Sequence, residues 1–73
     1  MELKEEGGFV RVRWTGYPYL SLMHVAEDGS RTTLGLWHRG GEARFPTEGL
    51  PPGGRFEVQL SQGLGVLTLL FPR

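Results

Sequence analysis

The sequence contains no cysteine, so neither a disulfide nor a cysteine-ligated metal stabilises this chain. It also lacks isoleucine and asparagine, and seven of its eight basic residues are arginine. This composition is typical of a small bacterial protein from a GC-rich genome and is poor in heat-labile residues. We therefore expect a thermophilic source, although codon bias alone would produce the same pattern.

No stretch is long and apolar enough for a membrane span, and the first residues are acidic rather than basic, unlike a secretory signal. We expect a cytoplasmic protein that does not contact a membrane. Eight acidic residues balance eight basic ones, and this lack of net charge argues against a nucleic-acid partner. A domain of 73 residues without disulfides has little stability to spare, so we also expect a homo-oligomer.

Twelve glycines and five prolines divide the chain into short runs in which apolar and polar residues alternate. Alternation of this kind is typical of β-strands, and no run has useful helical spacing. Strands are expected at 9–14, in hairpins at 19–38 and 55–71, and at 42–46, whereas residues 1–8 are expected to fray. The sequence predicts one all-β domain over residues 9–73, a small antiparallel β-sandwich.

The clearest element is the hairpin in residues 55–71. Gln62 and Gly63 can form a two-residue turn at its tip. The turn sets Ser61 opposite Leu64. The expected pairs on the apolar face are then Phe56 with Leu69, Val58 with Leu67, and Leu60 with Gly65. A slip of one residue would move every apolar side chain to the other face, so we expect this alternation to specify the register.

The second hairpin, in residues 19–38, has Asp28 and Gly29 at its expected turn. In this register Glu27 lies opposite Ser30. One face then carries Tyr19, Met23, Val25, Leu34 and Leu36, and the other carries Leu20, Leu22, Ala26 and Trp37. Both faces of the hairpin are therefore partly apolar.

Two interpretations of this hairpin stay open. In the first, its strands are central and packed on both sides, or a bulge changes their register. In the second, Leu20, Leu22 and Trp37 form an exposed patch, with Tyr17 at its rim. Such a patch would bind another protein or a second copy of the chain.

Two stretches carry a family resemblance. Residues 49–53 read GLPPG and precede RFEV at 55–58, and upstream VRWT at 12–15 precedes Pro18. The first stretch resembles the loop and strand that carry the tyrosine corner in fibronectin type III domains, which are immunoglobulin-like sandwiches. The upstream stretch resembles the second strand of that family and the turn that follows it. The corner position is Phe56, which has no hydroxyl, and the chain is short for a complete first strand. The resemblance implies a truncated sandwich that serves as a spacer or binding module, with an unrelated small barrel as the alternative.

The residues contain no convincing catalytic set. In the expected register His24 and His38 lie on opposite faces of their hairpin and at different levels, so they do not converge with a carboxylate. Asp28 sits in a turn, where backbone hydrogen bonding explains it. The serines lack the glycine context of a nucleophile elbow. We expect no enzymatic activity, no cofactor and no metal.

We predict a non-catalytic protein-interaction or structural module that binds another protein or itself. Two alternatives remain. Arg11 and Arg13 share a face with Phe9 and could bind single-stranded nucleic acid on a small barrel, although a solvated strand face also explains them. The rigid aromatic turn Tyr-Pro-Tyr at 17–19 could stack on a sugar, as in a carbohydrate-binding module, or plug the end of the sandwich.

Overall fold

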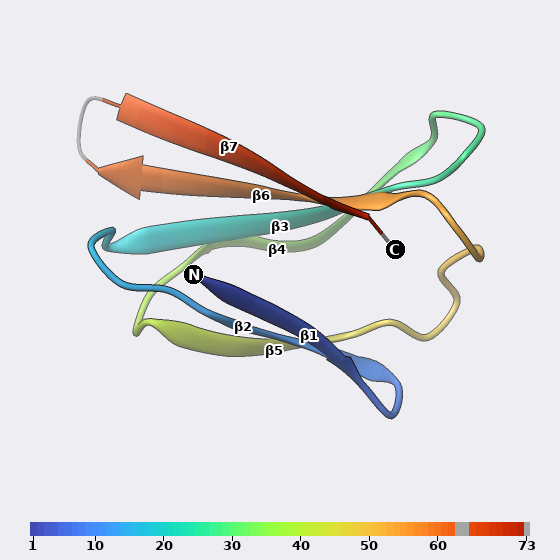
Figure 1. Ribbon diagram of the computed structural model, residues 1–73, viewed down its shortest axis with the longest axis horizontal. Coiled ribbons are helices and arrows are strands. Elements are labelled where there is room, and N and C mark those ends of the chain that lie inside the picture. Colours follow the sequence, from blue (N-terminus) through green and yellow to red (C-terminus); the bar gives the residue numbers. More distant parts are fainter. Residues whose placement is uncertain (63–64, 73) are drawn as a thin grey trace.

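The computed structural model describes residues 1–62 and 65–72. In these residues it contains no helix and seven strands: β1 (Glu2–Glu6), β2 (Phe9–Arg13), β3 (Tyr19–Val25), β4 (Arg31–His38), β5 (Glu42–Pro46), β6 (Arg55–Gln62) and β7 (Gly65–Pro72). The strands form two antiparallel sheets, ordered β1-β2-β5 and β4-β3-β6-β7. Figure 1 shows the sheets as two layers, with β7 at the margin of the larger one. The predicted small β-sandwich is confirmed.

The hydrophobic core lies between the two sheets. Alternation along β2 directs Val10 and Val12 into the core and leaves Arg13 exposed, as the sequence predicts. The central strands β3 and β6 contribute most of the remaining side chains. The buried cluster comprises Val10, Val12, Trp14, Leu20, Leu22, Phe45, Phe56, Val58 and Leu60. All of these residues are apolar, so burial of apolar surface is the main stabilising contribution.

The hairpin of β6 and β7 has the predicted faces but not the predicted register. Its pairs on the core side are Phe56 with Phe71, Val58 with Leu69, and Leu60 with Leu67. The pairing is therefore shifted by two residues, which keeps every side chain on the expected face because the side-chain period of a strand is two. The predicted turn includes Gly63, and the predicted partner of Ser61 is Leu64. Both of these residues lie outside the described part of the chain.

The hairpin of β3 and β4 differs more from the prediction. Its tip is a three-residue loop, because the Ala26 N–H donates to the Ser30 carbonyl at 2.8 Å. Farther along, the register shifts twice, on either side of Leu22. Trp37 adopts a positive φ of 50°, which is costly for a bulky residue and marks an irregularity in β4. The structure therefore supports a register changed by bulges, whereas the hairpin as a whole is not central, because β3 lies inside the sheet and β4 at its edge.

The N-terminal residues form a strand instead of fraying. Glu2–Glu6 pairs with β2 in a continuous antiparallel register, from Glu2 opposite Arg13 to Glu6 opposite Phe9. Leu3 packs partly against the core. We attribute the difference to backbone pairing with β2, which a strongly charged strand can use even though it has little to bury.

The proline-rich loop before β6 packs closely against the end of β3. The buried His24 ring bonds the Gly53 carbonyl through Nε2 at 3.0 Å. Gly54 has a φ of 80°, and a Cβ there would meet the Val25 carbonyl oxygen. Glycine at this position thus allows the loop backbone to approach β3, which sets the start of β6 beside it.

Candidate protein-interaction surface

The predicted contact patch does not exist as a single surface. Leu20 and Leu22 have no exposed area and belong to the core, so their prediction as surface residues is wrong. Tyr17 is half-buried and packs against the core. Trp37 is 40% exposed and stands apart from the two leucines.

The bulges in β4 are the physical reason for this separation. The predicted register places Leu20 opposite Trp37, but the observed partner of Leu20 is His38. The Trp37 N–H instead donates to the Ser21 hydroxyl at 2.8 Å, and Ser21 points to the face opposite Leu20. The extra residues in β4 thus remove Trp37 from the core-facing set.

The exposed apolar side chains lie mainly on the two edge strands of the larger sheet. β4 exposes Leu36 and Trp37, and β3 exposes Tyr19 at its first position. β7 exposes Val66 and Leu70 at 59% each, and Leu67 at 42%. Outside this sheet, Phe9 and Met1 are also exposed. Single apolar residues on a surface are ordinary, so the question is which of these groups forms a continuous site.

β7 forms the most continuous of these sites. Its eight residues carry no charged side chain, and it pairs with β6 in one unbroken register. Leu70 lies opposite Glu57, whose nearly buried carboxylate pairs with the Arg31 guanidinium at 3.3 Å. The outer edge of β7 presents backbone groups to the solvent, because no strand follows it in the sheet.

The other three edge strands carry features that discourage strand pairing. Four of the five residues of β1 are charged. β5 exposes Glu42 and Arg44 and ends at Pro46, and its Phe45 ring meets the His38 ring of β4 at 4.9 Å. β4 has its two register shifts. Charges and bulges are usual means of protecting an edge. β7 has neither and carries a proline only at its last residue, so it is the least protected edge among residues 1–62 and 65–72.

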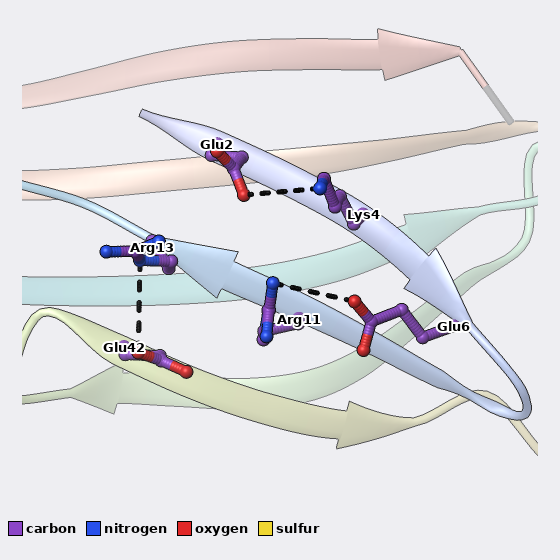
Figure 2. Close-up of polar contacts among 6 residues, drawn as sticks. All are labelled: Glu2, Lys4, Glu6, Arg11, Arg13 and Glu42. Atoms are coloured by element: carbon purple, nitrogen blue, oxygen red, sulfur yellow. Dashed lines mark ion pairs between the residues drawn. The ribbon is translucent and has the colours of Figure 1, made fainter.

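The arginines proposed for nucleic-acid binding lie on the outer face of the smaller sheet. Arg13 lies between Glu2 and Glu42, whereas Arg11 lies between Lys4 and Arg44. Figure 2 shows Arg11 beside Glu6 and Arg13 beside Glu42, at 3.5 and 3.9 Å between charged atoms. Lys4 and Glu2 approach at 4.0 Å on β1. Exposed pairs of this kind contribute little to stability, but they balance the charge of the face. On this face Glu2, Glu6 and Glu42 offset most of the charge of Lys4, Arg11, Arg13 and Arg44, so it does not form a strongly basic surface.

The residues that could take part in catalysis or metal binding do not lie together. Both histidines point toward the smaller sheet, which corrects their predicted placement on opposite faces: His24 packs on Phe56 and His38 on Phe45. The two rings contact different residues at different levels of the sheet. Among the described residues, no group of three histidine, aspartate or glutamate side chains could hold a metal ion.

The aromatic turn at 17–19 offers little free ring surface. Tyr17 is half-buried, and the Arg39 guanidinium lies 5.6 Å from the centre of the Tyr19 ring. A cation over the ring occupies one face of Tyr19, because it is attracted by the electron density there. A sugar that stacks on this face of Tyr19 would have to displace the Arg39 contact.

Val66, Leu67 and Leu70 were missed as site residues, although the sequence contains a signal for them. Residues 65–71 read GVLTLLF, in which both alternating faces are largely apolar. A strand of this kind is either central or has an apolar surface in the solvent. The prediction considered only the face that carries Leu67 and Leu69 and did not use this signal.

Comparison with protein-family models, with curated protein sequences and with solved structures finds no match. Within residues 1–62 and 65–72, no helix has the length and hydropathy that crossing a membrane requires.

Proposed function

We propose that this chain is a non-catalytic protein-interaction module that binds another strand along the edge of β7. The observation that carries the proposal is the combination of an uncharged strand, an unbroken register and exposed apolar residues at the open edge of a sheet. An added strand gains main-chain hydrogen bonds, and its side chains gain apolar contacts with Val66, Leu67 and Leu70. The proposed binding site is therefore the edge of β7 and not the predicted patch at Leu20, Leu22 and Trp37.

The resemblance to fibronectin type III domains remains part of the proposal. Sheets of three and four antiparallel strands are also the arrangement of seven-stranded immunoglobulin-like sandwiches, and this supports the resemblance. The corner residue Phe56 is fully buried at the start of β6. Domains of such architecture host many functions, so the binding role rests on the β7 edge and not on the fold. A cytoplasmic location stays a prediction.

Neither alternative class of ligand gains a supporting observation. Nucleic acid would need a basic surface, but Glu6 and Glu42 pair with Arg11 and Arg13, and the face as a whole carries nearly balanced charge. A carbohydrate would need open aromatic faces, but Arg39 lies over the ring of Tyr19. Protein binding through β7 requires no such rearrangement.

A charge-substitution experiment tests the proposed function. Val66 and Leu70 are both replaced by Lys, because lysines on an edge strand oppose pairing without disturbing the core. Leu36→Lys on β4 is the matched control, since Leu36 is 66% exposed on the opposite edge. Full-length chains are immobilised, and bound proteins are recovered from native lysate supplemented with free copies of the same chain.

We expect the wild-type chain and Leu36→Lys to retain the same protein, and the β7 double variant to lose at least nine-tenths of it. Thermal unfolding should be similar for all three, because the substituted positions are exposed. Retention that is unaffected by the two β7 lysines would refute the proposal. So would a wild-type chain that retains neither a foreign protein nor its own copies.

A further inference from the structure

The central residues of β7 form a nearly symmetric sequence. Residues 66–70 read Val-Leu-Thr-Leu-Leu, so Thr68 has large apolar residues at matching positions on both sides. We propose that the strand bound at β7 is β7 of a second copy, antiparallel and centred on Thr68. This inference rests on the proposed function and names its partner. The dimer would join two four-stranded sheets into one continuous sheet.

Symmetry restricts the register of such a dimer. A two-fold axis that relates antiparallel neighbouring strands is perpendicular to the sheet, so each residue faces a residue from the same side of its own sheet. With Thr68 on the axis, two hydroxyls can bond each other on the outer face. The remaining pairs across the interface are Val66 with Leu70, Leu67 with Leu69, and Gly65 with Phe71.

This register matches side chains by size. Val66 and Leu70 are the two most exposed large apolar residues of β7, and pairing them reduces the apolar area that both expose to water. Gly65 has open space around its Cα: apart from its chain neighbours, no atom of the described residues lies within 4 Å of where a Cβ would be. A half-buried Phe71 ring from the second copy can cover it, as aromatic residues often cover a glycine across neighbouring strands.

The neighbouring symmetric registers are worse. Centring the pair on Leu69 brings Pro72 into the ladder opposite Val66, where proline supplies no N–H. Centring it on Leu67 sets Val66 opposite Thr68, so an apolar side chain faces a polar one on the outer face. The Thr68 register pairs residues 65–71 and ends before the proline.

Charge also favours a second copy. β7 has no ionisable side chain, so two copies approach without a like-charge pair across the ladder. A partner strand as highly charged as β1 would instead bring charged side chains against Val66 and Leu70. These charges would lose contact with water, which costs free energy. Self-pairing avoids this desolvation.

The interface consists of one strand from each copy, which is less than the roughly 800 Å² per partner of a standard stable interface. We therefore expect a reversible dimer with a dissociation constant on the order of micromolar. In analytical ultracentrifugation, the mass should rise from that of a monomer to that of a dimer as the protein concentration increases. Val66→Lys with Leu70→Lys should stay monomeric throughout, and Leu36→Lys should behave as wild type.

Cysteine cross-linking tests the register, because the chain has no cysteine of its own. Directly opposed residues of an antiparallel ladder have Cα atoms within disulfide range. Thr68→Cys should therefore form a covalent dimer on mild oxidation. Leu70→Cys alone should not, because it faces Val66, but an equal mixture of Leu70→Cys and Val66→Cys chains should form the mixed dimer.

The outcomes separate this inference from the proposed function. A dimer that survives the two β7 lysines, or cross-links equally through Leu70→Cys alone, overturns the inference. So does a chain that stays monomeric at every concentration. If that monomer still captures a foreign protein through β7, the proposed function stands without the inference. If it captures nothing, both fail.

Discussion

The two edge strands of the larger sheet, β4 and β7, both contain exposed apolar residues, but they differ in the regularity of their backbone and in their packing against the rest of the molecule. β4 has two register shifts beside Leu22 and an irregular Trp37, and its His38 ring packs on Phe45 of the other sheet. β7 follows β6 in one register and carries no charge. One edge is irregular and packed against its neighbours, whereas the other is regular and open.

The difference shows that exposure alone does not identify a binding site. Leu36 is more exposed than Val66 or Leu70, but it lies in a strand whose irregular backbone cannot pair evenly with another. A regular edge offers its hydrogen-bonding groups at the spacing that another strand requires. We therefore assign the interaction to β7, and each prediction below tests one part of this contrast.

The largest expected difference is between the core beside β4 and the surface of β7. Leu22→Ala should lower the free energy of unfolding by about 2–5 kcal/mol, because it leaves a cavity in the core opposite Gly35. Val66→Ala should change it by less than about 0.5 kcal/mol. Urea denaturation at a concentration where the chain is monomeric measures both. Similar losses for the two variants would contradict the assignment of Leu22 to the core and Val66 to the surface.

A pair of glycines compares the packing of the two edges directly. A Cβ at Gly35 in β4 would collide with the Phe45 ring, whereas a Cβ at Gly65 in β7 would meet no atom within 4 Å. Gly35→Ala should therefore cost about 1–3 kcal/mol of stability, the range typical of overpacking. Gly65→Ala should leave stability nearly unchanged. A harmless Gly35→Ala would show that β4 is less tightly packed on β5 than the structure indicates.

The strained backbone of β4 predicts an unusual order of two variants. Trp37→Gly and Trp37→Ala remove the same ring, but glycine tolerates the positive φ of 50°. Trp37→Gly should therefore be more stable than Trp37→Ala by about 1 kcal/mol in thermal or urea unfolding. At Leu36 the order should be reversed, because glycine weakens an ordinary strand position. Alanine ranking above glycine at Trp37 would contradict the irregular conformation.

The smallest effect concerns the loop that joins β3 to β4. The Asp28 carboxylate accepts hydrogen bonds from the Ser30 N–H at 2.9 Å and from its hydroxyl at 2.7 Å, and these bonds lower the pKa of Asp28. A lowered pKa in the folded state contributes stability above the ordinary pKa, which is lost as the pH falls through the folded value. Asp28→Asn should therefore reduce the loss of stability below about pH 4.

The measurement that tests this prediction is a pH series of melting temperatures for the wild-type chain and for Asp28→Asn. The curves should converge as the pH falls below 4, because the wild-type carboxyl is then protonated. Parallel curves over the whole acidic range would show that the two hydrogen bonds to Ser30 are not sensitive to ionisation.

Much of the fold was predictable from local sequence, because alternation and turn residues act over a few positions. Glu42–Pro46 and the inward residues Val10 and Val12 of β2 are as expected. The β6–β7 register shifted by two residues without changing any face. The candidate site was not predicted: Leu20 and Leu22 proved to be core, and β7 was missed. A strand with two apolar faces can be central or exposed, and alternation does not distinguish these cases.

The sequence by itself determined the class of the fold and the strands of two of its hairpins, β3–β4 and β6–β7, since glycine, proline and period-two patterning act locally. Tertiary structure alone decided which strands lie at the edges, because β3 pairs with β6 across a long stretch of chain. It also decided the bulges in β4, which arise where the strand must fit beside β3 and against Phe45 at once. Long-range pairing left β7 with an open side, and this open side is the basis of the proposed binding site.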